Sequence, residues 1–174
     1  HYLKENKMAK ALFITTDDLR RKSIIGGTVD TDKFIQFIEV SQDIHIQNYL
    51  GTELYVKIQN DIVGGTLTGN YLSLVNDYIK PMLLHWSLVE YLPFGSVNIA
   101  NGGIYQKNPE NSTAITREHV DYLVEKARTT AQFYTNRFID FMQNNAAGLI
   151  PEYYSNSQED MYPDDVADFG GWVL

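Results

Sequence analysis

The sequence predicts a mainly α-helical protein, with a bundle of about five helices, a long C-terminal helix, a small β-hairpin and an extended C-terminal arm. Apolar residues recur at helical spacing through most of the chain. Residues 70–92 are apolar around most of a helical wheel, which is typical of a helix that others surround. A heptad-like apolar seam then runs through residues 117–145.

Composition indicates a globular protein of one domain with room for appended arms, since the chain has 174 residues and 44% of them are hydrophobic. The absence of cysteine excludes disulfides, thiolate metal sites and thiol catalysis. A net charge of −8 disfavours a protein that coats duplex nucleic acid, because such proteins need a dense cationic surface. The first residues include no apolar stretch typical of a secretory signal.

Three helices are expected before the central one, at about 16–23, 32–50 and 53–62. Hydroxyl and acidic residues at Thr15–Asp18 are typical of a helix start, and the cations Arg20–Lys22 are typical of a helix end. These cations could contact a phosphate or an acidic partner, but a solvated helix end is the simpler interpretation. Gly51 is placed to end the second helix with a positive φ angle.

The central helix is expected over residues 70–92, with a kink near Lys80–Pro81. Proline removes a backbone donor and clashes with the preceding turn. A membrane span is a poor alternative, because four ionisable residues interrupt the apolar run and charge at bilayer depth is costly. These residues are Asp77, Lys80, His85 and Glu90. We therefore expect this helix at the centre of a globular domain.

A small β-hairpin is expected at about residues 96–107. Asn101–Gly102 is the dipeptide most typical of a tight turn between two strands. An isolated two-stranded ribbon is marginal in water, so its apolar side chains should contact the helices or a neighbouring molecule. The residues expected to make this contact are Val97, Ile99, Ile104 and Tyr105.

The last helix is expected over residues 117–145, with Thr116 as its N-cap. Its apolar seam recurs in alternating threes and fours. The seam consists of Val120, Val124, Ala127, Ala131, Tyr134, Phe138 and Phe141. At about 1.5 Å per residue such a helix is roughly 43 Å long. It should either pack lengthwise on the central helix or project one end beyond it.

No motif in the sequence indicates an enzyme, a cofactor or a metal site. Glycine-rich phosphate loops and nucleophile motifs are absent. The histidines lack partners at metal-ligand spacing, and His85, beside Trp86, is best explained as a core or interface residue. An acidic cluster at residues 159–168 has a proline near its centre, where a calcium loop needs a glycine turn, so calcium binding is disfavoured.

The C-terminal arm, residues 151–174, is both acidic and aromatic. Residues 138–174 hold seven acidic residues and no lysine or arginine. One interpretation is a disordered, solvating tail. Solvating tails rarely carry many large apolar side chains, so we favour an arm that orders on a partner. The aromatic residues expected at this interface are Tyr153, Tyr154, Tyr162, Phe169 and Trp172.

These elements divide the chain into an N-terminal arm (1–15), a helical domain (16–150) and the C-terminal arm (151–174). Their order resembles that of the helical head-tail connector (adaptor) proteins of tailed bacteriophages. The local features that carry the resemblance are YLGTELY at 49–55, the long helix interrupted at Pro81, and NNAAGLIPEYY at 144–154. The order of elements and these local features are most like those of the connector or ring proteins of crAss-like and related phages of Bacteroidetes hosts.

The resemblance implies a non-enzymatic virion protein of the phage neck, made in the host cytoplasm and assembled as a ring of about a dozen copies below the portal. Such a ring binds portal, neck and tail proteins and extends the DNA channel. DNA passes through it without sequence-specific binding. The resemblance implies no catalytic, cofactor or metal-binding residue and no membrane contact. The competing hypothesis is a bacterial, non-enzymatic helical protein-binding module that acts as a monomer or dimer.

Overall fold

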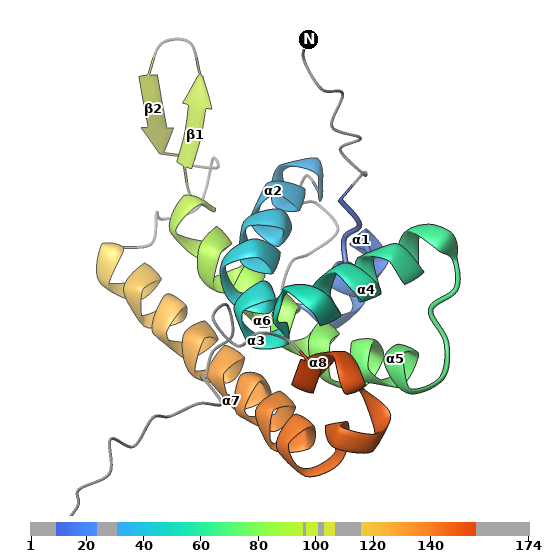
Figure 1. Ribbon diagram of the computed structural model, residues 1–174. Coiled ribbons are helices and arrows are strands. Elements are labelled where there is room, and N and C mark those ends of the chain that lie inside the picture. The colour runs from blue at the N-terminus through green and yellow to red at the C-terminus, as the bar shows by residue number, and fades with distance from the viewer. Residues whose placement is uncertain (1–9, 24–30, 96, 101–102, 107–115, 156–174) are drawn as a thin grey trace, which may run out of the picture.

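The computed structural model describes residues 10–23, 31–95, 97–100, 103–106 and 116–155. The predicted mainly helical class is confirmed (Figure 1). The α-helices are α1 (Thr16–Lys22), α2 (Thr31–Ser41), α3 (Gln47–Leu50), α4 (Thr52–Gly64), α5 (Gly69–Leu74), α6 (Lys80–Tyr91), α7 (Arg117–Leu149) and α8 (Pro151–Ser155). Two π-helical turns, η1 (Gln42–Ile46) and η2 (Val75–Ile79), and one 3₁₀ turn, η3 (Leu92–Phe94), extend them.

The expected central helix runs from α5 through η2 into α6 and η3, and it remains helical at Pro81. The helix is therefore continuous where a kink was expected, and the kink itself stays a prediction. The departure from α geometry next to this point is the π turn η2, which ends at Ile79, two residues before the proline. Pro81 lacks the N–H that would bond the carbonyl of residue 77, and its ring clashes with that carbonyl. A wider turn at this point moves the carbonyl aside and lets the helix continue.

α7 packs lengthwise and antiparallel on the central helix, so of the two expected arrangements this one is confirmed. Two stacked ring pairs fix the register. Tyr78 stacks on Phe141 with ring centroids 4.3 Å apart, and His85 stacks on Tyr134 at 5.0 Å. Partners on each helix are seven residues apart, as the heptad seam requires. Phe138 lies in the same seam and is fully buried.

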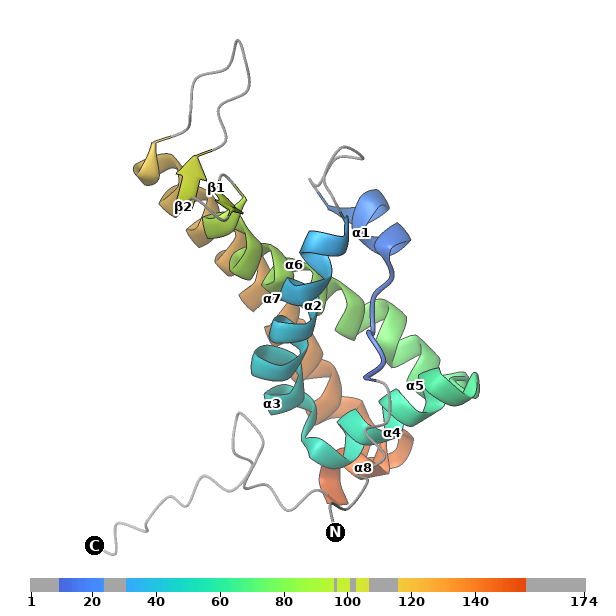
Figure 2. The same ribbon diagram turned by 90° about the horizontal axis from the view of Figure 1, so that it is seen from above.

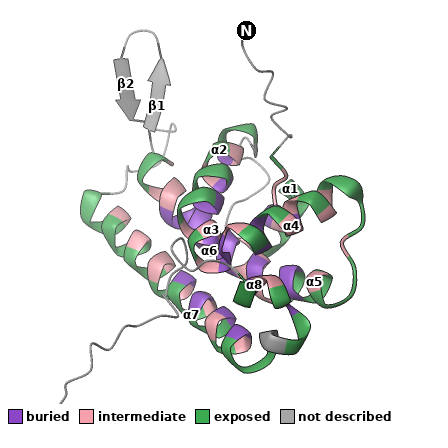
Figure 3. Cartoon of the chain, in the orientation of Figure 1, coloured by how far each residue is buried: buried purple, intermediate pink, exposed green. Residues whose placement is uncertain are grey.

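Trp86 joins α6 to the helices on both sides of it. Its indole Nε1–H donates to Thr135 Oγ1 of α7 at 3.0 Å. On the opposite side the imidazole of His45 stacks on it with centroids 4.0 Å apart. His45 Nε2 also lies 2.9 Å from Glu90 Oε1, so η1 is held against α6 by a ring contact and a polar contact. The core thus surrounds α6, with α2 and α7 packed on it and further buried residues from α1, α4, α5 and α8, as the buried positions in Figure 3 show.

The last residues of the expected N-terminal arm belong to the core, so the arm boundary at residue 15 is wrong. Phe13 and Ile14 are almost fully buried. The buried amide of Gln42 holds this segment: its Oε1 accepts from Phe13 N–H at 2.9 Å and its Nε2 donates to Ala11 O at 2.8 Å. Gln42 lies in η1, where one side chain satisfies backbone groups of a segment that has no strand partner.

The strands β1 (Val97–Ala100) and β2 (Gly103–Gln106) pair antiparallel, with Ile99 opposite Ile104. Figure 1 shows them extending away from the helices, beyond the end of α6. The side chains of Val97, Ile99, Ile104 and Tyr105 lie outside what the structure describes. Their expected contact with a partner therefore stays a prediction.

The expected extended arm is also wrong at its beginning, because residues 151–155 form the short helix α8. Proline is favoured in the first turn of a helix, where its missing N–H needs no partner. α8 packs on α4 and α7, and Tyr71 of α5 donates a hydrogen bond to Glu152 of α8. Tyr153, which was expected at a partner interface, is only 3% exposed and faces Phe138 in the core of its own chain.

Candidate functional site

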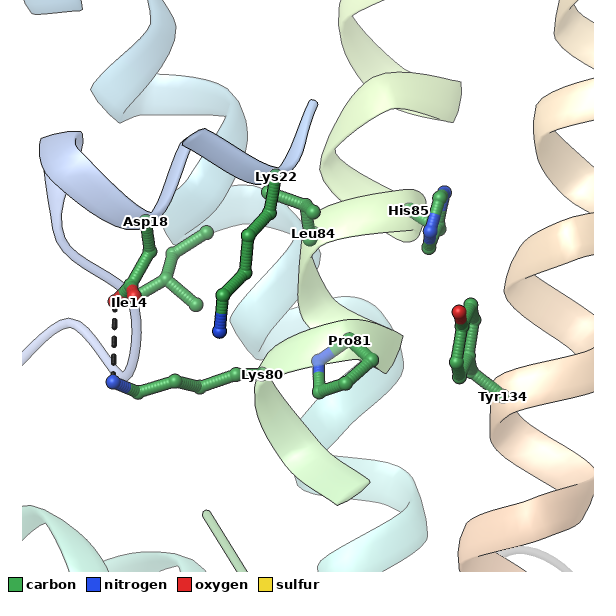
Figure 4. A pocket seen from close by; sticks show the side chains of 8 residues that line it. All are labelled: Ile14, Asp18, Lys22, Lys80, Pro81, Leu84, His85 and Tyr134. Carbon is green, nitrogen blue, oxygen red and sulfur yellow. Dashed lines mark ion pairs between the residues drawn. The ribbon is translucent and has the colours of Figure 1, made fainter. Parts of the chain in front are cut away.

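A pocket of about 230 Å³ opens between α1, α6 and α7. It is the candidate binding site that the structure adds to the sequence (Figure 4). Its lining residues come from three separate stretches of the chain and combine apolar, aromatic and charged side chains. They are Ile14, Asp18, Lys22, Lys80, Pro81, Leu84, His85 and Tyr134.

The capping box of α1 positions the acidic group of the pocket. Thr15 Oγ1 accepts from Asp18 N–H at 3.1 Å, and Thr15 N–H donates to Asp18 Oδ2 at 3.1 Å, which confirms the expected helix start. Lys80 Nζ lies 3.1 Å from the same carboxylate oxygen. Burial opposes the charge on Asp18, but these contacts outweigh it, so the pKa of Asp18 is lowered. Asp18 and Lys80 therefore neutralise each other at neutral pH.

Lys22 is the unpaired cation of the pocket. Within the part of the chain that the structure describes, no hydrogen bond or ion pair holds its ammonium group. Figure 4 shows its side chain extending into the space between α1 and α6, toward Lys80 and Pro81. It ends the run Arg20–Lys22, for which a solvated helix end was the simpler interpretation. The last of these cations lines the pocket, although its side chain is exposed as at a solvated helix end.

His85 and Tyr134 form an aromatic wall of the pocket, with ring planes within 6° of parallel. Burial lowers the pKa of His85 below its ordinary value of 6.5, because the surrounding apolar groups disfavour the imidazolium. The imidazole is therefore neutral at neutral pH. It supplies a flat surface and one donor and one acceptor nitrogen, but no positive charge.

We expect mild acid to destabilise the fold through His85. Because its pKa is lower in the folded than in the unfolded chain, the unfolded chain binds more protons, and stability rises with pH. The contribution of His85 to the free energy of unfolding is fully present above pH 6.5. It is lost as the pH falls below that value through the pKa of His85 in the folded chain. Melting temperatures measured between about pH 8 and pH 5 should fall less steeply in His85→Gln than in the unchanged chain. The exposed His119→Gln is the control, and equal slopes in all three proteins would contradict the assignment.

The pocket can bind a small group that combines negative charge with an apolar or aromatic surface. Lys22 offers a charge-assisted hydrogen bond to a carboxylate or phosphate. Pro81, Leu84 and Tyr134 offer apolar contact beside it. Among the described residues, no group of three or more histidine, cysteine or acidic side chains could hold a metal ion.

A second surface feature is a pair of exposed aromatic residues on the outside of α7. Tyr122 is 67% exposed and Phe133 is 63% exposed. They are eleven residues apart, close to three helical turns, so they lie on one face. This face is opposite the seam that packs on α6. Lys126 and Thr129, which lie between them on the same side of the helix, are polar and exposed, so the two rings are separate points at which a neighbouring molecule could make contact.

The sequence predicted neither the pocket nor the outer face of α7. Of the predicted interface residues, Tyr153 is buried, and Tyr154 is 39% exposed while its hydroxyl donates to Met142 O at 2.8 Å. Tyr162, Phe169 and Trp172 lie outside the described residues. A helical wheel drawn for the whole of α7 would have shown Tyr122 and Phe133 in line. No comparable signal links the three stretches that build the pocket.

The described residues form a small helical protein with a buried core, a pocket lined by charged and apolar side chains, and two exposed aromatic residues on α7. The chain belongs to a family of unknown function (DUF6712), whose model matches residues 46–161. No curated protein and no solved structure matches it. In the described part of the chain, none of the helices combines the length and the apolar character needed to cross a membrane.

Proposed function

We propose that this protein is a structural subunit of the head-tail connector of a tailed bacteriophage, and that it assembles as a ring between the portal and the tail. The observation that supports the proposal best is the exposed aromatic face of α7, Tyr122 and Phe133, on a body whose core is already closed. The core is buried without these two rings, so both rings are available for contact with a neighbouring molecule.

A closed ring needs two different surfaces on each subunit that meet head to tail. A second exposed apolar stripe lies on α2 and η1, where Val40 and Ile44 are one helical turn apart and both exposed. In the proposed ring the α7 face of one subunit packs on the α2–η1 stripe of the next. The net charge of −8 suits a channel that DNA crosses without being held.

Charge substitution on the α7 face should prevent assembly. Tyr122→Glu combined with Phe133→Glu places two carboxylates in the proposed interface, where desolvation is costly. We expect mass photometry to show monomers of this variant and ring-sized particles of the unchanged chain. Val63→Glu is the matched control, because Val63 is 61% exposed and lies on α4, outside both stripes. Equal assembly of the double variant and the control would refute the role of this face.

Removal of residues 156–174 should leave a folded monomer and abolish assembly. The body keeps its contacts, because Ser155 Oγ still donates to Glu53 Oε2 and Tyr153 stays in the core. Circular dichroism should show unchanged helix content, while mass photometry should show only monomers. Rings formed by the shortened chain would refute the role of this segment.

The alternative function is a non-enzymatic helical binding module that acts as a monomer or dimer. The pocket at Lys22 favours this alternative, since a module of this kind needs one recognition site and no self-assembly. Light scattering of the unchanged chain across a range of concentrations separates the two functions. Masses that never exceed a dimer, with and without a portal protein, support the module.

A further inference from the structure

We propose that the pocket between α1, α6 and α7 is the docking site for the acidic segment, residues 156–174, of a neighbouring copy of this chain. The inference rests on the proposed ring assembly and deepens it, because it names a donor and an acceptor surface. The argument uses the chemistry of the pocket, the chemistry of the segment and the positions of α1 and α8.

The pocket has one positive charge, that of Lys22, without an ion-pair partner among the described residues, and apolar lining residues lie beside it. Lys80 is neutralised by Asp18 at 3.1 Å, but Lys22 has no such partner in the described chain. Lys22 is exposed, so a carboxylate that reaches it would gain a charge-assisted hydrogen bond at the surface of the pocket. Next to it, Pro81 and Tyr134 present a surface on which an aromatic ring can pack.

The segment carries the matching groups at short spacing. It has no lysine or arginine, so its charge is uniformly negative. Its acidic residues are Glu159, Asp160, Asp164, Asp165 and Asp168, and its aromatic residues are Tyr162, Phe169 and Trp172. Tyr162 and Asp164 are two residues apart and would share a side of an extended chain. One could pack in the pocket while the other pairs with Lys22.

The size of the pocket supports a side chain as its occupant. At about 230 Å³ it is smaller than the roughly 300–1,000 Å³ of sites that enclose a cofactor or a drug-sized ligand. Arg20 and Arg21 are exposed beside it on α1. They extend the positive charge beyond the pocket, so a segment with several carboxylates would be attracted along its length.

The positions of α1 and α8 favour a neighbouring copy as the donor. The segment follows α8, whose last residue, Ser155, is bound to Glu53 of α4. α8 lies in front of the body in Figure 1, and α1 lies behind α4. Figure 2, turned by 90°, shows the two helices on opposite sides. A subunit that donates on one side and accepts on the other has the arrangement of a head-to-tail ring. Nineteen residues span up to about 60 Å when extended, which is enough to reach an adjacent subunit.

Cross-linking in the full-length protein tests this contact directly, because the chain has no cysteine of its own. One preparation carries Pro81→Cys and a second carries Val166→Cys, so that Lys22 and Asp164 both keep their charges. After mixing, a short bismaleimide should join the two chains covalently. We expect about tenfold more heterodimer than from the control pair of Arg21→Cys and Val166→Cys, because a docked segment raises the effective concentration at one position. Arg21 adjoins Lys22 in sequence but does not line the pocket.

The outcomes separate the docking site from the ring itself. Equal cross-linking of both pairs, with ring-sized particles still present, overturns the docking site and leaves the proposed function standing. Strong cross-linking at Pro81→Cys with masses that never exceed a dimer supports the docking site and refutes the ring. A chain with both cysteines that cross-links only within itself, even at high concentration, overturns the assignment to a neighbour.

Charge reversal provides a second measurement that needs no cross-linker. Lys22→Glu should weaken self-association about tenfold, and Asp164→Lys with Asp165→Lys should do the same, since each turns an attraction into a repulsion. The three changes together should restore part of the loss. No restoration, or an equal loss in Arg21→Glu, would overturn the pairing of the segment with Lys22.

Discussion

Phe138→Ala is expected to destabilise the protein by about 3–5 kcal/mol, the range typical of a fully buried phenylalanine. Phe138 has no exposed surface and lies in the α7 seam, with its ring centroid 6.4 Å from that of Tyr153 on α8. The substitution leaves a cavity at the point where α8 is held against the bundle. Urea denaturation followed by circular dichroism should show the midpoint falling sharply.

Phe133→Ala is the matched control for Phe138→Ala, because it makes the same chemical change five positions earlier on the same helix. Phe133 is largely exposed, so its loss should change the free energy of unfolding by no more than about 0.5 kcal/mol. The two variants therefore separate burial from residue type. A loss at Phe138 no greater than at Phe133 would contradict the described packing of α7.

Gln42→Leu is expected to cost about 3 kcal/mol, because it leaves buried backbone groups without partners. The Gln42 amide binds Phe13 N–H, Ala11 O and the hydroxyl of Tyr55, which lies 3.1 Å from its Nε2. Leucine has a similar volume but no polar atom. Burial raises the pKa of Tyr55 to about 12, so its phenol stays protonated. The hydroxyl therefore cannot ionise to make up for the hydrogen bond that it loses with the Gln42 amide.

Hydrogen exchange distinguishes this local effect from general destabilisation. In Gln42→Leu the Phe13 amide should exchange much faster, while amides in the middle of α6 should follow only the global loss. Gln59→Leu is the control, because Gln59 also donates to Ala11 O, but at 3.4 Å and without other described bonds to this segment. Protection of Phe13 that is unchanged in Gln42→Leu would contradict the account of how residues 10–15 are held.

Long elements with a clear apolar period were predictable from the sequence. The α7 seam and the central helix could both be predicted because apolar residues such as Val124, Phe138 and Leu83 recur at helical spacing, and this spacing indicates which side of a helix is buried. The π turns were not predictable, because a single added residue barely disturbs an apolar period of this kind. In η2 the cause, Pro81, was visible, but its effect was expected as a kink.

Short elements and the pocket depend on tertiary contacts that carry almost no sequence signal. Phe13 and Ile14 gave one hint of burial, an apolar pair before the first helix, and Pro151 gave one hint of a helix start. Tyr153 looked like an interface residue because its neighbours are acidic and aromatic. Its burial follows from α8 folding back on α7 and α4, which no local pattern reveals.

The mass and shape of the unchanged, purified chain test the central claim most directly. Mass photometry with negative-stain electron microscopy, at increasing protein concentration and with or without a portal protein, measures both. We expect ring-shaped particles of about a dozen copies. Particles that stay monomeric or dimeric under every one of these conditions would contradict the claim.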